Sequence, residues 1–216
     1  MRVEGPDFSP DFAERQHEEL NSLVREISTD TRRPCVACDL ACSCSASTTC
    51  KCDCSPDCAH APAMMTSDPE FPVESLIAPL VYAFLELRQC PPCWSCEGHL
   101  SPDGSLQRPP AIWFYSRSQI FPGMIGDFAA SMWAKKILNV PWRISIACTE
   151  PEFKVPAYAF QPDLSYVEKP SLPAMQKDIG VLAAGLRDDF QAKAEGLIRK
   201  MDIYLGDNST GKARSA

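Results

Sequence analysis

The chain has 216 residues, 45% of them hydrophobic, and a net charge of −7 at pH 7. This length suits one globular domain, or one domain with an appended segment, and a core of that size needs no disulfides. A protein with this net negative charge does not present the positive electrostatic field that attracts nucleic acid or anionic membranes, so we expect neither as a partner. Without a secretory signal pattern or a long apolar run, we expect a cytoplasmic protein.

Apolar residues at helical spacing predict four helices, near residues 10–28, 76–89, 123–138 and 172–205. Segments rich in β-branched and aromatic residues predict strands at 111–116 and 142–148, with 157–161 as a weaker third. The predicted fold class is therefore α+β: a small β-sheet packed by several helices, with an inserted cysteine-rich metal-binding loop.

The same pass along the chain predicts its domain organisation. An N-terminal amphipathic helix occupies 1–34, and a cysteine-rich metal-binding loop occupies 35–67. The loop region has few large aliphatic residues, so apolar burial alone does not order it. An α+β domain carrying a second Cys/His cluster follows at 68–206, and a disordered tail is expected at 207–216.

The first cysteine cluster reads CVACDLACSCSASTTCKCDCSPDCAH, at residues 35–60. Clustered thiolates repel one another unless a soft cation neutralises them, and a reducing compartment keeps them from forming disulfides. Cysteine sulfur and histidine nitrogen are also the preferred ligands of zinc. The predicted metal ligands are Cys35, Cys38, Cys42, Cys44, Cys50, Cys52, Cys54, Cys58 and His60.

This segment resembles the metallothioneins in its cysteine density, its Cys-x-Cys repeats and its lack of aromatic residues. The resemblance covers residues 35–60 only. It implies that several zinc or copper ions are bound. Independently of the resemblance, the Cys-x-Cys spacing lets neighbouring sulfurs serve adjacent metals, so one thiolate can bridge two ions.

The second cluster, CPPCWSCEGH, places Cys90, Cys93, Cys96 and His99 within ten residues. A Cys3His zinc site would use all four side chains. An iron–sulfur cluster would use the three cysteines and a distant thiolate, for which Cys148 is the candidate. The CPPC motif follows a predicted helix instead of opening one, which disfavours a thioredoxin-like dithiol.

These patterns lead to one main functional hypothesis and two alternatives. The main hypothesis is a metal-binding protein, with zinc as the expected metal, that serves metal handling or a metal-stabilised interaction with a protein partner. The first alternative is an iron–sulfur redox protein or an accessory subunit of an enzyme. The second is a zinc-dependent hydrolase in which Glu97 activates a metal-bound water, so the sequence leaves open whether the protein is an enzyme.

Overall fold

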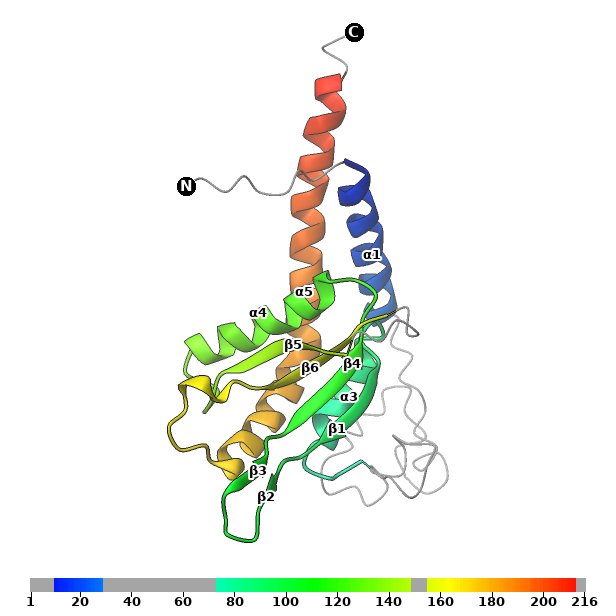
Figure 1. Cartoon of the computed structure of the whole chain (residues 1–216). Helices are drawn as coiled ribbons and strands as arrows, with labels where there is room; N and C mark the ends of the chain where they lie inside the picture. Colours follow the sequence, from blue (N-terminus) through cyan, green and yellow to red (C-terminus); the bar gives the residue numbers. More distant parts are fainter. Residues whose placement is uncertain (1–9, 29–72, 149–154, 213–216) are drawn as a thin grey trace, which may run out of the picture. The chain divides into compact units, whose positions relative to one another are not determined.

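The computed structural model describes residues 10–28, 73–148 and 155–212 (Figure 1). The predicted metal-binding loop at 35–67 lies outside these residues, and with it all eight cysteines of the first cluster and His60. Their role in metal binding therefore stays a prediction.

The chain divides into two compact units, and each is described by itself. The first unit comprises Met1–Asp30 and Asp188–Ala216, and the second comprises Thr31–Arg187. In the first unit, helix α1 (Pro10–Ser28) runs beside the C-terminal part of helix α5 (Leu172–Lys212) in the opposite direction (Figure 1). His17 Nε2 lies 2.8 Å from Asp202 Oδ1 and joins the two helices.

The four predicted helices are confirmed: α1 has the predicted ends, and the other three differ from the prediction at one or both ends. Besides α1 and α5, they are α3 (Ala78–Glu86) and α4 (Ile120–Ala134). Pro79 lies in the first turn of α3, where its missing N–H has no helical partner to lose, so it begins the helix without kinking it. No helix in the described ranges is long and apolar enough to cross a membrane.

A four-stranded antiparallel sheet with strand order β1-β4-β6-β5 forms the centre of the second unit. All three predicted strands are present, as β4 (Ala111–Tyr115), β5 (Trp142–Cys148) and β6 (Ala157–Pro162). Strand β1 (Pro92–Cys96) and a small hairpin of β2 (His99–Leu100) and β3 (Leu106–Arg108) were not predicted, because proline disfavours strands and the hairpin strands are very short.

One face of the sheet carries the hydrophobic core. Phe114 and Phe160 are fully buried there, and the ring of Phe84 from α3 packs 5.0 Å and 5.9 Å from theirs. Helix α4 lies on the same face, with Gly126 in contact range of Ile144. Helix α5 packs on α4 through Gly185 and Phe128, so three helices build one core with the sheet.

Alternate strand residues point to the opposite face. Trp94 of β1 is paired with Trp113 of β4, and Trp94 remains 39% exposed. Farther along the sheet, Gln161 of β6 is paired with Arg143 of β5. This second face therefore presents aromatic and polar side chains instead of an aliphatic core.

A buried carboxylate anchors the turn that follows α4. Asp178 of α5 is fully buried and accepts hydrogen bonds from the backbone N–H groups of Asn139 and Val140, at 2.9–3.1 Å. It also accepts a bond from the Asn139 side chain at 2.7 Å. These donors satisfy the charge of Asp178 and fix the chain where it turns into β5.

We expect Asp178→Ala to lower the free energy of unfolding by about 2–4 kcal/mol, because two backbone N–H groups would lose their acceptor. Asp127→Ala is the matched control, since Asp127 is exposed on α4. Urea denaturation followed by circular dichroism measures both. Equal effects of the two substitutions would contradict this role of Asp178.

Candidate metal site

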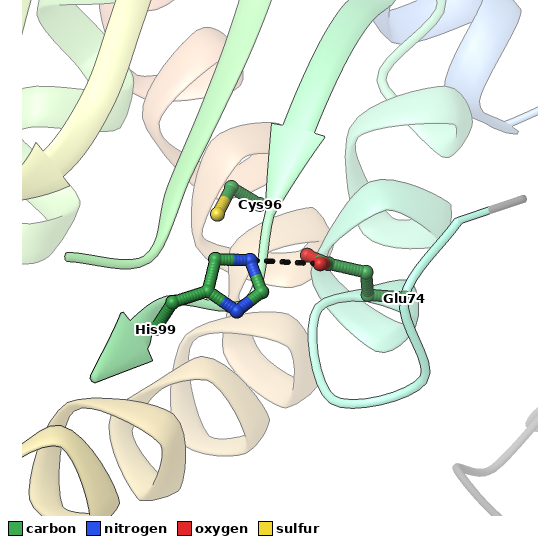
Figure 2. A group of neighbouring side chains, drawn as sticks. All are labelled: Glu74, Cys96 and His99. Carbon is green, nitrogen blue, oxygen red and sulfur yellow. Dashed lines mark ion pairs between the residues drawn. The ribbon is translucent and has the colours of Figure 1, made fainter. Parts of the chain in front are cut away.

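Glu74, Cys96 and His99 form a group of three side chains that can hold a metal ion (Figure 2). Each residue contributes one ligand atom, and these atoms all lie within 4.8 Å of one another. Among the described residues this is the one group of at least three Cys, His, Asp or Glu side chains gathered so closely.

Two of these residues flank a tight turn after β1. Cys96 is the last residue of β1 and is 2% exposed, while His99 begins β2 and is partly exposed. Between them, Gly98 has φ +89°, a conformation that favours glycine. Its N–H also lies 3.4 Å from Cys96 Sγ and donates to it. The turn therefore brings the thiol and the imidazole together.

Glu74 comes from the segment before α3 and is held by reciprocal hydrogen bonds. The backbone N–H of Glu97 donates to Glu74 Oε2 at 2.6 Å, and the backbone N–H of Leu76 donates to Glu97 Oε2 at 2.9 Å. Gln176 of α5 adds a bond to the Glu97 carbonyl at 3.1 Å. These bonds tie the segment to the end of β1, next to the other two ligand atoms.

The electrostatic surroundings keep the Cys96 sulfur protonated when no cation is bound. Burial raises the pKa of the Cys96 thiol, and the negative charge of Glu74 raises it further. The Gly98 N–H and the Arg108 side chain act in the opposite direction, because both stabilise a thiolate. His99 Nε2 lies 2.9 Å from Glu74 Oε1, as the dashed line in Figure 2 shows.

The donor set suits a borderline metal ion. It combines one carboxylate oxygen, one imidazole nitrogen and one sulfur, all of which bind zinc. Bond lengths of about 2.0–2.3 Å place the donors of a tetrahedral zinc site about 3.3–3.8 Å apart. The three ligand atoms lie within 4.8 Å of one another, so small side-chain movements would bring them to that spacing.

The structure brings together two of the four ligands predicted in the second cluster, Cys96 and His99, and leaves Cys90 and Cys93 outside the group. Cys90 is fully buried, and burial raises its pKa to about 12, with a smaller opposing effect from a hydrogen bond with Ser116. Cys93 is exposed. The three thiols of the Cys-x2-Cys-x2-Cys run therefore do not meet at one point.

Strand geometry accounts for this separation. The Cys-x2-Cys spacing brings two sulfurs onto one ion when the chain turns between them. Cys93 and Cys96 instead lie in the extended strand β1, where residues three apart are separated by about 10 Å. The β-bulge between Pro92 and Trp94 does not convert this stretch into a turn.

The remaining predicted site residues have other positions. Glu97 uses its carboxylate to hold Leu76, so the structure gives it a positioning role beside the site. Cys148 ends β5, but its side chain lies outside the described part of the structure.

Sequence reasoning missed Glu74, a ligand candidate that the fold supplies. It lies in EFPVES, between the two clusters and 16 residues from both Cys58 and Cys90, and that stretch contains no cysteine or histidine that would suggest a metal site. The only sequence signal is a carboxylate just before a helix that leads into CPPCWSC, and such carboxylates are common at helix starts for electrostatic reasons.

Comparisons with known protein families, with curated proteins and with solved structures found no match to this chain.

The turn at Gly98 provides a test of the site's architecture. A Cβ atom on Gly98 would lie 2.5 Å from Leu172 Cδ1 and 3.0 Å from the Pro110 backbone nitrogen. We expect Gly98→Ala to lower stability by about 2–4 kcal/mol, through crowding and backbone strain together. Gly104→Ala is the control, because Gly104 has φ +81° but no atom near an added Cβ, so only the strain applies. If Gly98→Ala and Gly104→Ala lower the free energy of unfolding equally in urea denaturation, the predicted crowding at Gly98 is wrong.

The buried thiol of Cys90 predicts a loss of stability in alkali. Its pKa rises from 9.0 to about 12 on folding, so only the unfolded chain ionises between these values. The contribution of Cys90 is fully present below pH 9.0 and is lost towards pH 12, at up to about 1.4 kcal/mol per pH unit. Urea midpoints from pH 8 to 10.5 should fall more steeply for the unchanged protein than for Cys90→Ala. Parallel curves would contradict this prediction.

Proposed function

We propose that this chain is a zinc-binding protein for metal handling, with one site at Glu74, Cys96 and His99 and further metal bound by the cysteine-rich segment. The observation that carries the proposal is the gathering of the three ligand atoms within 4.8 Å. A reducing compartment such as the cytoplasm would keep the thiols available for metal.

The donor types favour zinc over an iron–sulfur cluster, copper(I), magnesium and calcium. Iron–sulfur clusters are held mainly by cysteine thiolates, whereas Cys96 is the single thiol in this group. Copper(I) prefers soft sulfur ligands, and magnesium and calcium prefer oxygen alone. A mixed set of oxygen, nitrogen and sulfur is well suited to zinc.

Three protein ligands leave one tetrahedral position for another group. That position supports metal handling, because an entering thiolate can bind the ion before a protein ligand leaves. The cysteine-rich segment or a partner protein would supply such thiolates. A zinc-dependent hydrolase would need Glu97 as its base. The Glu97 carboxylate already accepts a hydrogen bond from the Leu76 N–H, so we propose metal handling instead of hydrolysis.

The test isolates the folded site within the 216-residue chain. All eight cysteines from Cys35 to Cys58 are replaced by serine. This removes the thiols of the cysteine-rich segment, so that zinc retained by the protein is not bound by them. We expect this protein to retain one zinc ion after desalting, measured by elemental analysis. Adding Cys96→Ser or His99→Gln should weaken zinc binding more than about tenfold in competition with a chromophoric chelator, because each removes a ligand.

Cys93→Ser is the matched control, because it removes an exposed thiol of the same cluster that lies outside the group. It should leave zinc affinity unchanged. Circular dichroism of every variant establishes that it is folded. The proposal is wrong if the background protein binds no zinc, or if Cys93→Ser weakens binding as much as Cys96→Ser does.

A further inference from the structure

The sheet face opposite the core contains a pocket of about 470 Å³ that is open to solvent, here called the cavity. Its lining comes from β1, β3, β4 and β6 and from the loop between β3 and β4: Trp94, Arg108, Pro109, Ala111, Trp113 and Gln161. Ligand pockets of soluble proteins typically measure about 300–1,000 Å³, so this one has room for a small organic molecule.

An aromatic wall borders the cavity. Trp94 and Trp113 are direct neighbours across β1 and β4, with ring centroids 5.1 Å apart and planes tilted by 54°. The two indoles therefore pack against each other and form one aromatic surface. Trp94 is 39% exposed although it is a large aromatic residue, which leaves an indole surface open to a flat ring.

The charge of the cavity is positive. Arg108 is the one charged lining residue, and its guanidinium lies 5.8 Å from the ring centre of Trp94. Among the described residues no carboxylate forms a salt bridge with Arg108. Gln161 adds an amide that can donate a hydrogen bond. The lining thus combines a cation, an uncharged donor and two indoles.

We propose that this cavity binds a planar aromatic carboxylate. The flat ring would stack on the indole wall, and the carboxylate would receive the two parallel hydrogen bonds that a guanidinium offers. A single cation matches a single negative charge. An aromatic phosphate, which carries nearly two, would leave charge uncompensated on a protein of net charge −7.

This binding site goes beyond zinc binding and does not depend on it. None of the lining residues belongs to the Glu74, Cys96 and His99 group. Arg108 nevertheless connects the two places, because it pairs with His99 across β2 and β3 and its side chain hydrogen-bonds with Cys96. A bound carboxylate would consequently lie next to the metal site.

Isothermal titration calorimetry of the metal-free 216-residue protein with 2-naphthoate tests the proposal, with 2-naphthamide as the uncharged probe of the same shape. We expect 2-naphthoate to bind at least about tenfold more tightly than 2-naphthamide. Arg108→Gln should remove most of this preference. Trp113→Leu should weaken binding of both probes, because it removes part of the stacking surface.

Arg143→Gln is the matched control, since Arg143 neighbours Gln161 but lies 3.4 Å from Asp163, which engages its charge. It should leave both affinities unchanged. Equal binding of the two probes, no binding of 2-naphthoate, or an unchanged preference in Arg108→Gln would overturn the proposal. Because these titrations use metal-free protein, a failure of the zinc site would not affect their outcome.

Discussion

The arrangement of the candidate site depends on the paired hydrogen bonds between Glu74 and Glu97. The backbone of Glu97 donates to the Glu74 carboxylate, and the Glu97 carboxylate accepts from Leu76. These bonds join the start of α3 to the end of β1 at two points. The contact of 2.9 Å between His99 Nε2 and Glu74 Oε1 adds a third link, which holds the Glu74 carboxylate beside the ring of His99. The Glu74 carboxylate can then act as a ligand, while Glu97 fixes its position.

The order of elements explains why these residues meet. Helix α3 buries Phe84 against Phe114 and Phe160, which places its start and the following strand β1 along one side of the sheet. The chain leaves β1 through Gly98, where only a residue without a side chain fits beside Leu172. Core packing, one glycine and one pair of carboxylates together bring the three ligand atoms into reach.

The sequence predicts the regular elements better than it predicts the site. Apolar periodicity identifies four helices, and β-branched and aromatic residues identify β4, β5 and β6, because burial of one face produces those patterns. The cysteine spacing at 90–96 suggests a metal-binding turn, but edge pairing with β4 makes this stretch a strand and separates its thiols. Glu74 could not be predicted, because only the tertiary fold brings it to Cys96.

Charge balance links the metal site to the neighbouring cavity. A Cys96 thiolate and the Glu74 carboxylate would together neutralise the two charges of a zinc ion, with His99 neutral. Arg108 and the Glu97 carboxylate then add one charge of each sign beside the site. An occupied metal site would therefore be close to electrically neutral, and Arg108, which also lies over the Trp94 ring, would remain the one charged residue that lines the cavity. Because a neutral metal site would not repel a carboxylate bound beside it, metal binding and ligand binding would be electrostatically compatible.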